Sequence, residues 1–133
     1  MSLLVLPAGD AACRRAAKSG NASAAATLSR TEFSDRVENF FEYEPLVAGK
    51  ASRFNIHLTD LSEGAPLGNA EVTVIARSEG GEEVASSLAR PGTVLGIYVA
   101  ELALPKPGQY GLEFHVRTAG LDQRMPLHGF VVE

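Results

Sequence analysis

The chain has few or none of several residue types that would define a structural class at once. Its 133 residues include one cysteine and no tryptophan. A lone cysteine excludes an intrachain disulfide and a zinc cluster built from cysteines. Lys and Arg total 12 against 16 Asp and Glu, for a formal charge of −4. This balance argues against a nucleic-acid-binding protein, because phosphates favour a basic surface. No apolar run is long enough to cross a membrane as a helix.

What is present describes one soluble globular domain. Hydrophobic residues make up 45% of the chain and charged residues 21%, which is an ordinary balance for a folded protein. Thirteen glycines and seven prolines predict many turns, and the core must be built from aliphatic residues, Phe and Tyr. The same content of glycine and proline excludes a coiled coil.

Residues 1–34 differ in composition from the rest. A short apolar run at the start is followed by a stretch rich in Ala, Ser, Gly and Asn, which buries too little apolar surface to offset the entropy of ordering. We therefore expect a disordered low-complexity tether or the remnant of an export signal. Ala11-Ala12-Cys13 resembles the end of a bacterial lipoprotein signal, so one hypothesis is a lipid anchor on Cys13, and the other is a free thiol.

Residues 35–133 alternate between apolar and polar side chains in short runs separated by turn residues. Phe54, Ile56 and Leu58, for example, alternate with polar neighbours at a period of two. The glycine-rich turn at residues 79–82 joins two such runs into a predicted hairpin. The predicted strands are 36–43, 53–59, 71–77, 83–89, 96–104, 109–117 and 125–132.

About seven strands at this spacing, with no helical period between them, predict an all-β fold, an immunoglobulin-like antiparallel β-sandwich. We expect Phe54, Ile56 and Leu58 to project into the core from one sheet, and Tyr110, Leu112 and Phe114 from the other. Tyr110 follows a Pro-Gly turn, and its hydroxyl is expected to bond back to the turn backbone.

The sequence carries no motif for catalysis: there is no phosphate-binding glycine loop, no nucleophilic serine turn and no His-x-x-x-His pair. Glu42 and Glu44 are better interpreted as a solvated strand face than as an acid/base pair. We therefore expect a protein that is not an enzyme and needs no cofactor.

Three histidines are the remaining candidates for chemistry. His115 and His128 fall on the last two predicted strands, which pair in an immunoglobulin-like order, so the two are expected to lie across from each other with Met125 close by. Imidazole and thioether ligands suit a soft or borderline metal ion. The set His115, His128 and Met125 is therefore a candidate metal site, against the alternative of ordinary exposed histidines; His57 should lie on the other sheet.

Residues 41–61, which read FEYEPLVAGKASRFNIHLTDL, resemble the opening of the N-terminal domain of periplasmic adaptors, the membrane fusion proteins of RND-type heavy-metal efflux pumps. Residues 89–92, 107–110 and 129–132 fit the same pattern, and the similarity covers about 31–133. The resemblance implies an exported, periplasmic β-sandwich with a non-enzymatic recognition or spacer role in efflux of copper, zinc, cobalt or cadmium. It carries over no ligand residue. A complete adaptor has further domains, so the chain is either an excised N-terminal domain, which we expect, or a stand-alone relative.

The partners implied are pump or adaptor subunits, a heavy-metal ion or a periplasmic metal carrier, with no nucleic acid and no membrane insertion by this domain. Ile75, Tyr98 and Phe130 sit at outward positions and are candidate contact points, against the alternative of burial in the second sheet or under a loop, which we favour for Phe130. Two alternatives stay open: a transthyretin-like or carboxypeptidase-regulatory-like module, which residues 57–60 and 66–74 resemble, and a generic immunoglobulin-like spacer of an exported protein. The hydroxyisourate-hydrolysing branch of the first ends in Tyr-Arg-Gly-Ser, which this chain lacks.

Overall fold

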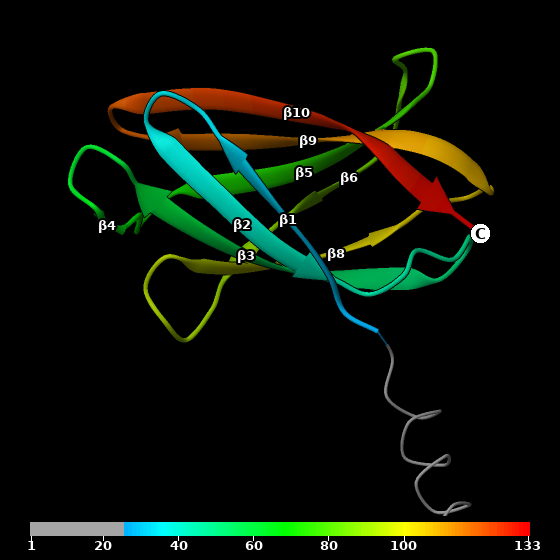
Figure 1. Ribbon diagram of the computed structural model, residues 1–133, viewed down its shortest axis with the longest axis horizontal. Coiled ribbons are helices and arrows are strands. Elements are labelled where there is room, and N and C mark those ends of the chain that lie inside the picture. Colours follow the sequence, from blue (N-terminus) through cyan, green and yellow to red (C-terminus); the bar gives the residue numbers. More distant parts are fainter. Residues whose placement is uncertain (1–25) are drawn as a thin grey trace, which may run out of the picture.

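The computed structural model describes residues 26–133, and all their regular structure is β-strand. Figure 1 shows the strands in two layers that face each other. The strands are β1 (Leu28–Phe33), β2 (Val37–Tyr43), β3 (Ala51–Asp60), β4 (Ala65–Pro66), β5 (Glu71–Ser78), β6 (Glu83–Leu88), β7 (Arg90–Pro91), β8 (Ile97–Ala103), β9 (Gly108–Thr118) and β10 (Leu121–Val132).

The two layers are antiparallel sheets. Sheet A has the order β1-β2-β3-β8-β7, with β4 paired to β3, and sheet B has the order β10-β9-β5-β6. Apart from β1, this is the strand arrangement of an immunoglobulin-like sandwich, in which the chain crosses between sheets after its second, fourth and fifth main strands. The predicted fold class is therefore confirmed, and each of the seven predicted strands matches one of the longer strands of the structure.

The core lies between the sheets and is filled by alternate residues of each strand. Phe54, Ile56 and Leu58 are 0%, 0% and 2% exposed, and the opposing residues of β9 are also buried, as predicted. Phe41 of sheet A contacts Phe114 of sheet B, with ring centroids 4.5 Å apart. Each fully buried Phe or Leu stabilises the fold by roughly 1.5–3 kcal/mol, so this contact layer supplies much of the stability.

Tyr110 begins the inward series of β9 and ties the preceding turn to the strand. Its hydroxyl donates a hydrogen bond of 2.7 Å to the carbonyl of Lys106. The predicted bond to the turn backbone is confirmed, and it is the tyrosine corner of immunoglobulin-like domains.

Strand β1 corrects the boundary of the predicted tether at residue 34. It pairs with β2 along its whole length, so the sandwich begins at Leu28, while Cys13 and the segment predicted to be a tether or export-signal remnant lie outside the described residues. Arg30 holds the polar segment of β1 against sheet B. Its guanidinium lies 4.4 Å above the ring of Phe130 and donates a 3.0 Å hydrogen bond to the carbonyl of His128 on sheet B. These are contacts between residues far apart in sequence, which local composition does not reveal.

Arg30 therefore fastens the edge of sheet A to the edge of sheet B. We expect Arg30→Ala to lower the free energy of unfolding by about 1 kcal/mol, because it removes a cation–π contact and a charge-assisted hydrogen bond. Urea unfolding measures the change, and Arg53→Ala, an exposed arginine on the same sheet, is the matched control. Equal losses in the two variants would contradict the role of Arg30.

Asn39 is the one side chain of the described residues that breaks the apolar pattern of the core without a partner. It is 0% exposed, and neither its amide nitrogen nor its amide oxygen has a hydrogen-bond partner in the described structure. It points inward on β2, in register with Leu58 of β3. An unpaired amide in such a place costs free energy.

We expect Asn39→Leu, a change of similar shape, to raise the free energy of unfolding by about 1–2 kcal/mol, since it removes the desolvation cost of the amide. Thermal and urea unfolding check this. Asn55→Leu, on the outer face of the neighbouring strand, should change stability by less than about 0.5 kcal/mol. Destabilisation by Asn39→Leu would mean that the amide is hydrogen-bonded in solution.

Candidate functional site

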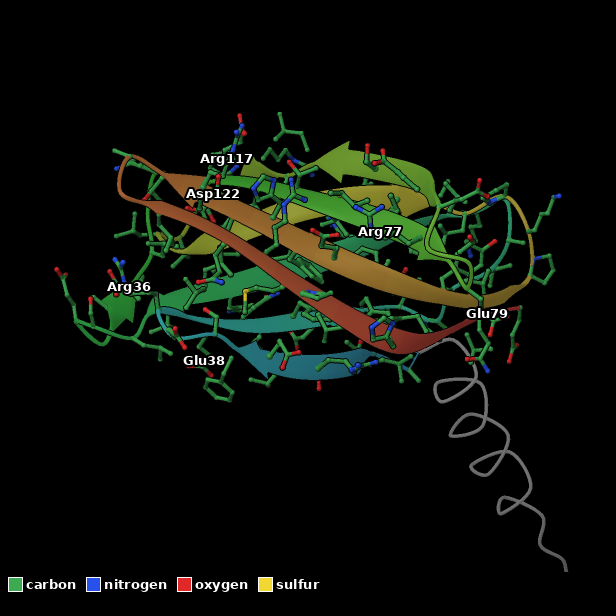
Figure 2. The ribbon with its side chains drawn as sticks, turned by 90° about the horizontal axis from the view of Figure 1, so that it is seen from above. Arg36, Glu38, Arg77, Glu79, Arg117 and Asp122 are labelled. Atoms are coloured by element: carbon green, nitrogen blue, oxygen red, sulfur yellow. The ribbon has the colours of Figure 1, made fainter. Side chains whose placement is uncertain are left out.

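The outer face of sheet B carries a set of charged side chains linked into pairs. Strand alternation directs odd-numbered residues of β5 and β9, and the even-numbered residues of β10 that precede its bulge (122 to 128), away from the core. We call this set the charged face. Figure 2 shows Arg77, Arg117 and Asp122 along this layer, with Arg117 and Asp122 together at one end. The charged face consists of Glu71, Arg77, Glu113, His115, Arg117, Asp122 and Arg124.

Glu113 lies at the centre of the charged face. Its two carboxylate oxygens accept hydrogen bonds from different strands: Oε1 from Nε of Arg77 at 3.0 Å, and Oε2 from Nη1 of Arg124 at 2.7 Å. Both arginines are diagonal neighbours, because Ile75 and Pro126 stand directly opposite Glu113 in the strand register. Three strands are therefore joined through one carboxylate.

Glu113 is only 8% exposed, although it is charged and on an outer face. Burial pushes its pKa upward, but the hydrogen bonds and charges of Arg124 and Arg77 outweigh burial and hold the pKa below its usual value. The carboxylate is thus ionised at neutral pH and fixed in position. A face organised in this way presents its two arginines in a defined geometry to any partner that docks on it.

The far end of the charged face holds two more pairs. Arg117 on β9 donates to the Glu71 carboxylate on β5, and this hydrogen bond raises the pKa of Arg117 above its usual value. Nε2 of His115 lies 2.6 Å from Oδ1 of Asp122, and this hydrogen bond lowers the pKa of the Asp122 carboxyl. Both pairs include well-exposed side chains, so their contribution to stability is small.

A hollow of about 290 Å³ opens beside the charged face, towards the β5–β6 turn. It is lined by Arg77, Glu113 and His128, among others. Gly111 lies in its floor, where a Cβ would come 3.1 Å from the carbonyl oxygen of Leu127 and 3.4 Å from the His128 ring. The close approach arises because a bulge between Leu127 and Phe130 shifts the register of β10.

The structure does not bring together the three residues of the predicted metal site. β9 and β10 pair as expected, but His115 lies opposite Arg124, while His128 falls in the bulge beside Gly111. Met125 faces the core and is 2% exposed, so its thioether is on the other side of the sheet from both histidines. The predicted cross-strand placement is therefore wrong, and His115 instead pairs with Asp122. Between residues 26 and 133, no three His, Cys, Asp or Glu side chains are grouped so that they could hold a metal ion.

His57 lies on sheet A, as predicted, with its Nε2 3.8 Å from Oε1 of Glu42 and its ring against Phe40. Glu42 is directed to the same outer face. Glu44 lies after the end of β2 and is exposed. The solvated-face interpretation accords with these positions.

The three predicted contact points are buried. Ile75, Tyr98 and Phe130 are 8%, 3% and 1% exposed. Tyr98 points inward and its hydroxyl donates to the carbonyl of Leu67, while Phe130 lies under Arg30 because the bulge turns it towards the core. The apolar side chains that the structure exposes are others, among them Phe33, Leu88, Val94, Leu95 and Val131.

Sequence reasoning missed the residues that make the charged face. Arg77 and Glu113 sit at outward positions of correctly predicted strands, so the alternation marks them as a polar face. Arg124 lies in β10 just before residue 125, where the predicted strand begins. Their pairing depends on the register between β5, β9 and β10, which one sequence does not fix.

No protein-family model and no curated protein matches this chain. In the part of the chain that the structure describes, no helix has the length and hydropathy needed to cross a bilayer. The fold and the charged face define the molecule as an immunoglobulin-like β-sandwich with an ordered polar face on its four-stranded sheet.

We expect Glu113→Gln to lower the free energy of unfolding at pH 7 by about 1–2 kcal/mol, because a neutral amide replaces a carboxylate held by two arginines. The folded-state pKa of Glu113 is depressed, so its stabilisation is complete above the unfolded pKa and is lost as pH falls through the folded one. The difference between variant and parent should therefore narrow below about pH 4. Urea unfolding from pH 3 to 8 measures it; a difference that is constant with pH would contradict the ion-pair account.

Proposed function

We propose that this chain is a non-enzymatic recognition domain and that the charged face of sheet B is its docking surface. The observation that carries the proposal is the fixing of Glu113 between Arg77 and Arg124, 8% exposed and shared by three strands. Arginine is the charged residue most favoured in protein interfaces, because its guanidinium binds carboxylates in a defined geometry. Held in place before binding, these side chains lose little conformational entropy when a partner arrives.

At a finer level, we propose that the domain belongs to a periplasmic adaptor of an RND-type heavy-metal efflux system. The support is the resemblance of residues 41–61, which form the end of β2, the connection that follows and all of β3. That connection holds the end of β10: the amide of Ala48 donates to the carbonyl of Glu133 at 2.8 Å, and the amide of Glu133 to the carbonyl of Leu46 at 3.0 Å.

This clamp gives the resembling segment a mechanical role that suits a recognition or spacer domain. Leu46 is 5% exposed and anchors the connection in the core, and the amide of Gly49 donates to the carbonyl of Leu104 at 2.7 Å. These hydrogen bonds join the connection to both sheets at one end of the sandwich, so a force applied to that end acts on both sheets. In the proposed assembly, the partner is a pump or adaptor subunit in the periplasm, and the charged face meets it.

The proposal is tested in cells of the organism that encodes the chain. Deleting the gene should lower tolerance to at least one of copper, zinc, cobalt and cadmium. Restoring it with Arg117→Glu should fail to recover tolerance fully, because the reversed charge repels the partner's surface. Arg117 is half exposed, so the variant is expected to fold.

The matched control is Arg53→Glu, which reverses an exposed arginine on sheet A and should restore full tolerance. Immunoblotting shows that the three proteins are present at equal levels. A deletion with unchanged tolerance to all four metals would end the adaptor proposal. Loss of tolerance with Arg53→Glu and not with Arg117→Glu would end the choice of docking face.

A further inference from the structure

The row of outward side chains on β9 is interrupted at one position. Odd-numbered residues of β9 point away from the core, and at Gly111 this row has no side chain. The register sets Arg77 of β5 directly opposite Gly111. On the other side, the bulge of β10 sets two residues opposite Gly111 alone, and His128 is the first of them. The hollow therefore lies over a missing side chain, between an arginine and a histidine.

The ring of His128 stands at the wall of the hollow. A Cβ on Gly111 would come 3.4 Å from its Nδ1, so the imidazole lies on the outer side of the sheet. His128 is held in the fold by its backbone, because its carbonyl accepts the hydrogen bond from Arg30. An imidazole carries at least one N–H in every protonation state. The ring can therefore donate to a ligand in the hollow without any loss to the fold.

Arg77, on the opposite wall, also has donors to spare. Its Nε donates to Oε1 of Glu113 at 3.0 Å, and its Nη1 makes a long contact of 3.4 Å with the carbonyl of Gly81. These contacts use two of the five N–H groups of a guanidinium. The Nη2 amino group has no hydrogen bond to any residue between 26 and 133. Because Glu113 fixes the plane of the guanidinium, the unused donors are held in a defined direction.

Positive charge exceeds negative charge around the hollow. The Glu113 carboxylate in its wall is shared by Arg77 and Arg124, and Arg30 lies beside the bulge. Glu79 is the other carboxylate of the lining, but it is exposed in the β5–β6 turn. Figure 2 shows Glu79 at the end of the sheet, beyond Arg77, where water screens its charge. The hollow is therefore suited to an anionic group, and a carboxylate is the anion that guanidinium donors bind best in proteins.

The size of the hollow limits what it can take. Pockets for small ligands have volumes of roughly 300–1,000 Å³, so a hollow of about 290 Å³ is at the lower end and suits a single side chain. We propose that the hollow is a specificity pocket of the docking surface and receives an acidic side chain, Asp or Glu, of the partner protein, with its carboxylate between Arg77 and His128. This inference rests on the proposed function, since the partner is the protein that docks on the charged face.

The test is titration of the isotope-labelled full chain with acetyl-glutamate-methylamide, a single glutamate with both ends capped, at neutral pH and low salt. Amide NMR shifts should move at Gly111, His128 and Gly129, with a dissociation constant on the order of 1–10 mM. The matched probe is acetyl-glutamine-methylamide, which has the same shape and no charge. It should bind about tenfold more weakly or less, because it lacks the charge that strengthens the hydrogen bonds.

Two variants locate the binding. His128→Ala removes one donor and should raise the dissociation constant of the charged probe about three- to tenfold. Gly111→Val fills the hollow and should abolish the shifts. A Cβ on Gly111 comes 3.1 Å from the carbonyl oxygen of Leu127, so if this variant disturbs the strands, His128→Ala decides alone. His57→Ala, a histidine on the outer face of sheet A, is the matched control and should leave the affinity unchanged.

Equal binding of the charged and neutral probes, or no binding of either, would overturn the proposal. An affinity unchanged by His128→Ala would overturn it as well. The docking function is decided separately by metal tolerance: if Arg117→Glu impairs tolerance and the charged probe does not bind, the charged face stands and the pocket falls. Binding of the charged probe to a chain whose Arg117→Glu variant restores full tolerance would leave an acid-binding pocket and overturn the docking face.

Discussion

The rest of the structure depends on one constraint: every second side chain of each strand packs into a single core layer between the two sheets. Phe41 and Phe114, from opposite sheets, meet at 4.5 Å, and Phe54 and Phe130 complete the same aromatic cluster. Every strand must present one face to this layer. Once the inward residues of a strand are set, the residues between them must lie on its outer face.

The charged face is a direct consequence of this constraint. Glu113 lies between Leu112 and Phe114, both buried in the core, so its side chain must leave on the other side of the sheet. The register then sets Arg77 and Arg124 on either diagonal. A carboxylate this poorly exposed is stable as an ion because two guanidinium groups satisfy it. The alternation of side chains along the strands therefore produces both the apolar core and the charged face.

The sequence was sufficient to predict what depends on local periodicity. Each long strand except β1, the inward position of Phe54 and the Tyr110 hydrogen bond all follow from patterns within about ten residues. The departures depend on contacts between distant segments. β1 is held by Arg30 across to sheet B, and the bulge between Leu127 and Phe130 turns the Phe130 ring inward. His128 is distant from His115 because the register of β9 and β10 sets Arg124 opposite His115.

In the candidate site, too, local periodicity predicts which residues face outward but not which of them pair. Alternation marks Arg77 and Glu113 as outward residues, but their pairing needs the register of three strands. The placement expected for the metal candidates is wrong because Met125 occupies an inward position and the register of β9 and β10 sets Arg124, not His128, opposite His115. Asn39 is a further departure, since a polar residue at an inward position follows no periodic rule.

We propose that a partner docks on the outer face of sheet B and not on the outer face of sheet A. Photocrosslinking in cells tests this most directly, with a photoreactive side chain in place of Arg124 on sheet B or Arg53 on sheet A. The account predicts a covalent adduct with a pump or adaptor subunit from position 124 and none from position 53. An adduct from position 53 alone would contradict it.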